Sequence, residues 1–213
     1  MSRKTPTELN WERLDSRHRS AEGNDLILFR TRFDRMRHPM SGEVLERLVL
    51  ESVDWVNMVA IDSEGDVVMV RQFRFGAGYA TLETPGGMVD PGEDSLTAAK
   101  RELLEETGYG GGEWRYLGAV EPNPAIHDHL CHHWLATDVE RVAEPRPGRG
   151  EMLVVERMSE AQVAQAVRGG VIRHALALSA LSRVFELMPR PFAEASGVRA
   201  DVEVRRRQRN ETV

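Results

Sequence analysis

Much of the chain consists of short segments in which apolar and polar residues alternate, the pattern typical of half-buried strands. Each segment is rich in β-branched, aliphatic or aromatic residues and is bounded by turn formers, such as Ser63-Glu64-Gly65 between two of them. Residues 1–24 are polar and lack this pattern. The sequence predicts strands at residues 26–37, 44–53, 55–62, 67–75, 114–120, 130–136 and 152–156.

A helix is predicted in the middle of the chain, between the two groups of strands. It starts near Leu96, where Asp94 or Ser95 can cap the free backbone N–H groups. Gly108 ends it, because glycine readily adopts the left-handed conformation of a helix terminus. The predicted helix is therefore about three turns long.

Two further helices are predicted after the last strand. Ser159 and Gln162 have the spacing of a capping box, and Gly169-Gly170 stops this helix. The last helix has an apolar stripe and is ended by Pro189; the stripe consists of Leu178, Leu181, Phe185 and Met188. The elements together predict an α/β fold of the α+β kind, a mixed sheet with helices packed on it.

Composition adds limits to this picture. With 213 residues, 41% of them hydrophobic, the chain can bury the core of one domain, which we expect at residues 25–190 between an N-terminal arm, 1–24, and a locally basic tail, 191–213. A net charge of −6 gives no overall attraction for nucleic acid. The single Cys131 cannot form an internal disulfide, and no apolar run approaches the roughly twenty residues of a membrane span. A cytoplasmic protein is expected.

The candidate chemistry lies at the end of the middle helix. Glu102, Glu105 and Glu106 stand at i, i+3 and i+4, so their carboxylates project from one helix face, and Arg101 is expected to relieve only one of these three charges. A divalent cation would relieve the others, and oxygen ligands without convergent His or Cys residues favour Mg²⁺, or Mn²⁺, over zinc. Because protein-bound Mg²⁺ commonly also binds substrate phosphates, the cluster predicts a phosphate-bearing ligand. The alternative to a metal site is that the three glutamates simply form an acidic helix face exposed to solvent.

More than the glutamates supports the catalytic interpretation. The segment resembles the box of the Nudix hydrolase superfamily, with a departure at Tyr109, where the family more often has an aliphatic residue. The resemblance implies a Nudix α/β/α sandwich with an N-terminal β extension, over about residues 26–188. The matching positions are Gly87, Glu93, Arg101, Glu102, Glu105, Glu106 and Gly108.

The resemblance also implies a reaction, the Mg²⁺-dependent hydrolysis of a nucleoside diphosphate linked to another group. Carried over by position, Glu102 and Glu106 are the first candidates for metal ligands, with the backbone carbonyl of Gly86. Glu105 is either a third ligand or the partner of the box arginine, which orients the glutamates in the family. Glu93 is expected to act through water or through the structure of its loop.

The flanking segments resemble the ADP-ribose and nucleoside-diphosphate-sugar pyrophosphatases within this superfamily. The stretch Val70-Arg71-Gln72-Phe73-Arg74 and the stretch from Leu82 to the box carry the resemblance, as does Pro124, fifteen residues past Tyr109. It implies that Arg74 and Gln72 face phosphate or base and that Glu83 reaches the nucleoside. The alternative for Arg71 and Arg74 is that they are ordinary polar residues at the edge of a strand, without a role in binding.

Two positions depart from that subgroup. The segment from Asp128 to His132 lacks an arginine found in related bacterial sequences, so the choice of substrate is expected to differ. The acidic residue that acts as general base in the subgroup aligns with Gly150; we take the adjacent Glu151 as the candidate base, with Glu144 as its alternative.

The residues from His127 to His133 include four histidines and Cys131. Zinc is one interpretation, but the spacing does not match structural zinc sites. Alternation along a strand with one wet face is the simpler explanation.

Partners and competing functions follow from the same resemblance. We expect a homodimer formed through residues 26–55, with a nucleotide sugar as substrate and neither nucleic acid nor a membrane as partner. Two alternatives to a nucleotide-sugar pyrophosphatase remain. One is a Nudix hydrolase of a nucleoside triphosphate, a dinucleoside polyphosphate or coenzyme A, and the other is a sensor that binds a nucleotide sugar without cutting it.

Overall fold

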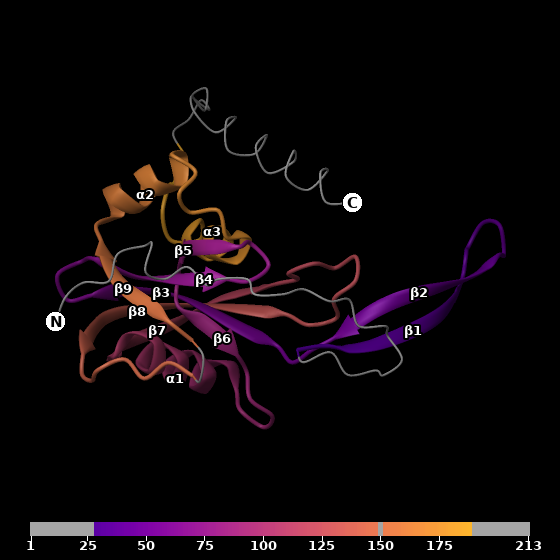
Figure 1. The fold of residues 1–213 in the computed structure, drawn as a ribbon, viewed down its shortest axis with the longest axis horizontal. Helices are drawn as coiled ribbons and strands as arrows, with labels where there is room; N and C mark the ends of the chain where they lie inside the picture. The colour runs from indigo at the N-terminus through magenta and orange to yellow at the C-terminus, as the bar shows by residue number, and fades with distance from the viewer. Residues whose placement is uncertain (1–27, 149–150, 189–213) are drawn as a thin grey trace.

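The computed structural model describes residues 28–148 and 151–188, which form a seven-stranded mixed sheet with helices on both faces and a separate two-stranded ribbon (Figure 1). The predicted N-terminal arm and C-terminal tail lie outside the described residues. The main path through the sheet is β5-β4-β3-β8-β7, with β6 added to β3 and β9 to β4. The strands are β3 (Trp55–Asp62), β4 (Val67–Arg74), β5 (Tyr79–Glu83), β6 (Gly86–Met88), β7 (Tyr109–Val120), β8 (Cys131–Arg141) and β9 (Leu153–Met158).

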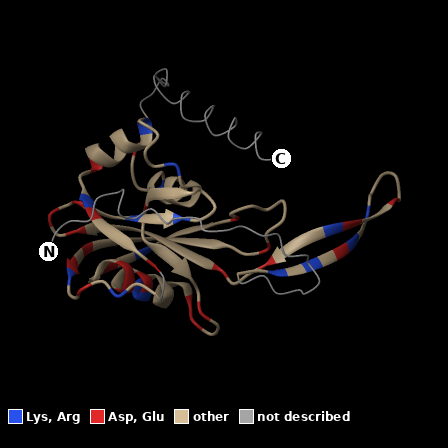
Figure 2. Ribbon diagram, in the orientation of Figure 1, with Lys and Arg blue, Asp and Glu red and all other residues tan. Residues whose placement is uncertain are grey.

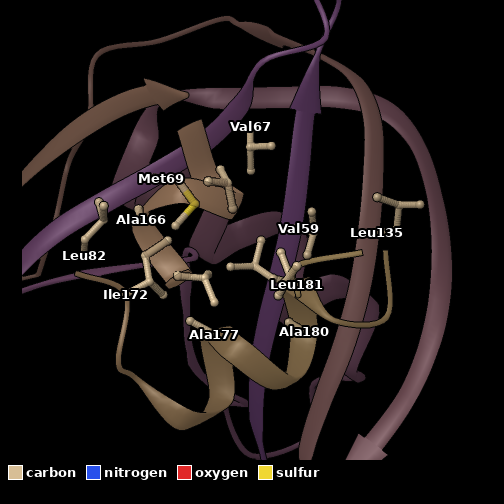
Figure 3. Packing of buried hydrophobic residues seen from close by; sticks show 13 residues of the cluster. Val59, Val67, Met69, Leu82, Leu135, Ala166, Ile172, Ala177, Ala180 and Leu181 are labelled. Atoms are coloured by element: carbon tan, nitrogen blue, oxygen red, sulfur yellow. The ribbon is translucent and has the colours of Figure 1, made fainter. Parts of the chain in front are cut away.

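The sheet is parallel only at its centre, where β3 pairs with β8. A strand that is covered on both faces must be apolar on both, and Met58 and Val59, neighbours on β3, are both completely buried. Met58 belongs to the core beneath α1 (Ser95–Thr107), and Val59 to the core beneath α2 (Glu160–Arg168) and α3 (Ala175–Leu181) (Figure 3). The α/β/α sandwich expected from the sequence is therefore confirmed.

Local signals define both ends of α1, as predicted. Asp94 caps the N-terminus by accepting hydrogen bonds from the backbone N–H groups of Leu96 and Thr97 at 2.9 and 3.0 Å. Gly108 ends the helix in the left-handed conformation, with φ of 75°, and its N–H bonds the Leu104 carbonyl. The acidic box residues consequently occupy the last two turns.

The C-terminal helices agree with prediction in part. The capping box of Ser159 and Gln162 is present at the start of α2. The predicted last helix is too long, because α3 ends at Leu181 and is followed by turns, while Met188 is half exposed rather than part of a buried stripe. Phe185 packs on the core from these turns. Its helical spacing from Leu181 therefore did not mean that the helix continues to it.

Several strand predictions were wrong in extent. β7 starts before Trp114, at Tyr109, because a glycine-rich stretch that sequence propensity disfavours pairs with β8. β8 and β9 run further than predicted, to Arg141 and Met158. The alternation predicted across 127–133 holds only from Cys131, where β8 begins. The short β5 and β6 were not predicted.

The ribbon of β1 (Arg30–Arg37) and β2 (Val44–Glu51) extends away from the sandwich (Figure 1). The predicted 26–37 begins outside the described residues, and within them β1 starts only at Arg30, while β2 ends at Glu51, before the predicted 53. The ribbon carries charges of both signs (Figure 2), yet it also exposes large apolar side chains. Backbone bonding from Leu50 N–H to the Ile126 carbonyl at 2.7 Å attaches its base to the sandwich. The apolar side chains exposed on the ribbon or its turn are Phe33, Met36, Met40, Val44 and Leu48.

No helix within residues 28–148 and 151–188 combines the length and apolar character needed to cross a bilayer.

Candidate active site

The helix α1 and the short strand β6 place the box residues against each other. The carboxylate of Glu102 lies directly over Gly87, so that a β-carbon at position 87 would overlap its oxygens. At Gly86 a β-carbon would overlap the side chain of Asn57 and the backbone of Val56 on β3. The two glycines are thus required by close approach, one to a carboxylate and one to the neighbouring strand.

Glu106 is the most deeply buried of the box glutamates, only 5% exposed. Its Oε2 accepts a hydrogen bond of 3.0 Å from the Gly86 backbone N–H. Burial raises the pKa of Glu106 to about 8, and the nearby charge of Glu102 adds to this effect. Burial also raises the pKa of Glu102. These two carboxylates lie where a bound cation would stabilise their ionised form.

Arg101 connects the acidic residues of the box. Its guanidinium donates to Glu93 at 2.9 and 3.1 Å, to Glu102 at 2.8 Å and to Glu105 at 3.3 Å. The expectation that it would relieve only one glutamate on the helix was wrong, because a planar guanidinium with five donors can bond several acceptors at once. A further bond to the Met88 carbonyl fixes it beside β6.

The contacts of Glu105 and Glu93 distinguish between their predicted roles. Glu105 is the partner of Arg101, and its side chain is 47% exposed. Glu93 also accepts from the Asp90 backbone N–H at 3.1 Å, which closes the loop between β6 and α1. This loop and α1 form an acidic region visible in Figure 2.

Among the described residues, no three acidic, histidine or cysteine side chains already converge as metal ligands. The donor set nevertheless suits a divalent ion that takes its remaining ligands from a substrate and from water. Glu102, half-buried, and Glu106, buried, provide carboxylate donors with raised pKa values, and Gly87 leaves room for the first of them. All the donors are oxygens, which favours a hard cation.

A cavity of about 530 Å³ opens beside these carboxylates. Glu102 and Glu106 line this cavity together with Gly86 and Gly87. The lining also contains a cationic side chain, Arg74, and a histidine, His174. A second hollow, of about 500 Å³, lies at the base of the ribbon and contains none of the box glutamates. The full lining of the first is Leu28, Trp55, Val56, Asn57, Gln72, Arg74, Gly76, Ala77, Gly86, Gly87, Met88, Glu102, Glu106, Glu151, His174 and Leu176.

Of the predicted substrate residues on β4 and β5, Gln72 and Arg74 line this cavity, whereas Glu83 is buried behind Arg74 and is not part of the lining. Arg74 binds Glu83 with two hydrogen bonds, of 2.9 and 2.8 Å, and Thr81 also donates to Glu83. Burial alone would raise the pKa of Glu83, but the bonds and charge of Arg74 hold it below its usual range. Gln72, two residues before Arg74, lines the same cavity. Arg71 instead pairs with Glu156 across β4 and β9, the strand-edge alternative.

The remaining predicted residues divide between the cavity and the outside. Glu151 lines the cavity and accepts a 2.9 Å hydrogen bond from the Gly148 N–H. Glu144 is 74% exposed, pairs with Arg141 and does not line it. Pro124 is exposed in the turn after β7 and also lies outside the lining.

The histidines after this turn form a ring cluster. His127 and His129 stack with centroids 5.1 Å apart, and Phe29 and Trp55 contact them. Cys131 is buried in β8, and burial raises its pKa to about 12. Within the part of the chain that the structure describes, these residues do not gather as a three-ligand metal site.

Sequence reasoning missed four lining residues with chemical relevance. Trp55 and Asn57 lie on β3, and His174 and Leu176 come from the start of α3. Of these only His174 gave a signal, because histidine is an unusual N-cap residue. The others are ordinary strand or helix residues whose approach to the cavity depends on the tertiary fold.

Comparison with known proteins gives consistent matches. The family described as "NUDIX domain" matches residues 53–177. An ADP-ribose pyrophosphatase of Mycobacterium tuberculosis is 30% identical over 171 residues, which cover 77% of this chain and 82% of the relative. An ADP-ribose pyrophosphatase of Bacillus subtilis is 31% identical over 106 residues, covering 50% of this chain and 57% of the relative.

Two further matches agree with these. An ADP-sugar pyrophosphatase of Mus musculus is 38% identical over 94 residues, 42% of this chain and 43% of the relative. The chain thus spans about half the length of the mouse and Bacillus proteins. A solved structure titled "Crystal structure of ADP compounds hydrolase" superposes with a TM-score of 0.64 at 23% identity, covering 80% of this chain and 88% of that chain. This last match shows a shared fold.

Proposed function

The chain belongs to the Nudix family and is a pyrophosphatase-type hydrolase, and from this premise we propose that it cuts the diphosphate bond of ADP-ribose or a related nucleoside diphosphate sugar. The products would be a nucleoside monophosphate and a sugar phosphate. The observation that carries the proposal is the single cavity that joins the buried box carboxylates to Arg74 and Glu151. ADP-ribose and ADP-sugar pyrophosphatases among the relatives support the choice of substrate.

Nudix hydrolases use divalent metal ions, and we assign Mg²⁺ to this chain, with Mn²⁺ as a substitute. Glu102, Glu106 and the Gly86 carbonyl would hold it. When bound, it supplies positive charge to the diphosphate oxygens and lowers the pKa of water toward neutrality. The all-oxygen donor set and the raised pKa values of both glutamates support this assignment.

The chain's own groups then have distinct tasks. Arg101 holds Glu102 through its 2.8 Å bond and so orients this carboxylate toward Gly87. Glu105 serves as a partner that keeps Arg101 in place. Glu151 is the proposed general base, since it lines the cavity and its charge acts on Arg74 and on both buried glutamates.

Substrate binding is assigned to the cationic part of the lining. Arg74 is held by Glu83 in a fixed orientation, and its guanidinium would contact the diphosphate. Gln72 and Glu83 would act beside it, on the sugar or nucleoside. Pro124, which lies outside the cavity of this chain, would contribute only by shaping the loop after β7.

A homodimer formed through residues 26–55 is part of the proposal. A two-stranded ribbon is only marginally stable alone in water, and this one exposes Phe33 and Leu48, cross-strand partners that are 56% and 39% accessible. A second copy of the chain would cover them. Light scattering at micromolar concentration should give twice the chain mass, and the variant carrying Phe33→Glu and Leu48→Glu should give the monomer mass. A monomer mass for the wild type would refute the proposed homodimer.

The function is tested by a substrate panel with and without Mg²⁺. ADP-ribose, GDP-mannose, UDP-glucose and NADH are assayed for released nucleoside monophosphate, beside a nucleoside triphosphate and coenzyme A. Hydrolysis of a nucleotide sugar that is abolished by a chelator and restored by Mg²⁺ is expected. Hydrolysis of only the triphosphate or coenzyme A would show that the enzyme acts on another class of substrate. Tight binding of ADP-ribose without hydrolysis would indicate a sensor.

A further inference from the structure

The start of α3 carries a residue that does not perform the usual task of its position. His174 occupies the N-cap with an extended backbone, φ −66° and ψ 118°, but its side chain makes no capping hydrogen bond. Ser, Thr, Asp or Asn are favoured there because a side-chain oxygen accepts from the first free N–H groups of the helix. The imidazole is directed elsewhere.

It is directed to the cavity described above. His174 lines the cavity, and its buried Nδ1 lies 3.3 Å from Oε2 of Glu83, a carboxylate that is 1% exposed, although this approach does not have the geometry of a hydrogen bond. The charge of Glu83 acts on His174, as does that of Arg74, whereas the box glutamates are not among the groups that shift it.

The environment of the ring sets its hydrogen-bonding character. Burial lowers the pKa of His174 and the opposing charge of Glu83 only partly offsets this, so the ring is neutral near pH 7. With Nδ1 facing an ionised carboxylate, the proton of a neutral ring belongs on Nδ1. The other nitrogen, Nε2, is then a hydrogen-bond acceptor for whatever occupies the cavity.

Two buried acceptors in the lining have no partner among the described residues. Oε1 of Gln72 and Oδ1 of Asn57 are buried, and no donor among residues 28–148 and 151–188 reaches them. The side chains of Gln72 and Asn57 are 7% and 5% exposed. Nε1 of Trp55, in the same lining, is an unpartnered donor. An unpartnered buried polar group is costly, so a ligand that satisfies these groups gains affinity.

The chemistry of these groups restricts what can bind beside them. Phosphate oxygens only accept hydrogen bonds from protein donors when ionised, so they cannot satisfy His174, Gln72 and Asn57. A nucleobase offers at most an amino group or two, whereas a pentose or hexose offers several hydroxyls, each of which both donates and accepts. The lining therefore suits a sugar.

We propose that His174 is a specificity-determining residue that accepts a hydrogen bond from a hydroxyl of the sugar attached to the diphosphate, with the charge of Glu83 beside Nδ1 favouring the tautomer in which Nε2 is the acceptor. The inference deepens the proposed function and rests on it. A site built to bond a substrate hydroxyl discriminates against a substrate that lacks one, because its buried polar groups are then left unpaired. The residue thus selects a sugar in this place over a group without hydroxyls.

The test compares two substrates and three variants. ADP-ribose is the sugar substrate, and the methyl ester of ADP is its counterpart without a distal sugar. His174→Asn removes the ring but restores a favourable N-cap, and His174→Phe keeps a flat ring without nitrogens. Arg173→Gln is the matched control, because Arg173 lies one residue away over the Tyr79 ring, 5.3 Å from its centroid, and outside the cavity lining.

For wild type and Arg173→Gln, kcat/KM is expected to favour ADP-ribose over the methyl ester by the same ratio. Both His174 variants should lower this ratio about tenfold or more, chiefly through KM for ADP-ribose, with the methyl ester little affected. His174→Asn should unfold at an unchanged or higher temperature, which excludes misfolding as the cause.

An unchanged ratio in folded His174→Asn would overturn the proposal, as would an equal loss for both substrates, which would place His174 at the nucleoside instead. Wild type that cuts none of the nucleotide sugars of the panel would refute the proposed function itself.

Discussion

The strongest pH prediction concerns a histidine that the catalytic proposal does not use. His133 lies on β8 and is completely buried, with Nε2 3.0 Å from the Ser179 hydroxyl of α3 and Nδ1 without a partner among the described residues. Burial lowers its pKa to about 4, and the positive charges of Arg183 and His132 act in the same direction. The variant His133→Gln removes the group that takes up a proton but keeps a side chain that can bond Ser179.

The sign and size follow from proton linkage. The unfolded chain binds a proton on this residue with a pKa of about 6.5, and the folded chain only at about 4. Between these values the unfolded state holds more protons, so the free energy of unfolding falls as the pH is lowered. The whole shift corresponds to about 3 kcal/mol, and about 2 kcal/mol of it should be lost between roughly pH 7.5 and pH 5.

Urea titrations near pH 7.5 and near pH 5 measure the effect. The decrease in unfolding free energy across this interval should be about 2 kcal/mol smaller in His133→Gln than in wild type, with similar m values. His38→Gln, in the exposed turn of the ribbon, serves as the control and should keep the wild-type pH dependence. Identical pH dependence in wild type and His133→Gln would refute the reasoning, because it would mean that acid does not act through this buried ring.

The other predictions concern the cavity. Glu106→Gln should lower kcat by about a hundredfold or more, because it removes a charge on which the metal depends, while the change Glu160→Gln, at an exposed position of α2, should leave kcat unchanged. Wild-type turnover in Glu106→Gln would refute the metal assignment. Gly87→Ala should lower activity and Mg²⁺ affinity together at an unchanged circular dichroism spectrum, since the added methyl group displaces the adjacent carboxylate; intact Mg²⁺ affinity would contradict this. Glu151→Gln should lose most turnover and Glu144→Gln very little, and the reverse order would exchange the two as general base.

The parts of this fold that sequence predicts well are those determined within a few residues. Asp94 and Gly108 bound α1 because a cap and a left-handed glycine act on their own helix. The capping box of α2 was predicted for the same reason. The strand β6 was missed because Gly86-Gly87 has the composition of a turn, and only pairing with β3 makes it a strand.

The candidate site likewise contains features that local sequence predicts and features that depend on the tertiary fold. Spacing alone predicted that the three glutamates share a helix face, since they stand at i, i+3 and i+4, whereas their proposed role as metal ligands came from the resemblance to the Nudix box. The several bonds of Arg101 could not be predicted from spacing, because two of them go to Glu93 in a loop that folds back over the helix. His174 reaches the cavity from the other end of the chain, and its contact with Glu83 depends on how α3 packs on the sheet.

The central pair of strands has a consequence for the order of folding. β3 ends at Asp62 and β8 begins at Cys131, and every box residue lies in the segment between them. Parallel pairing across such a long interval must overcome the entropy of closing a large loop before it gains stability. The cavity walls on β3 and α1 are therefore expected to reach their final positions late, so destabilising the β3–β8 pair should slow the recovery of enzyme activity during refolding more than it slows the appearance of helix.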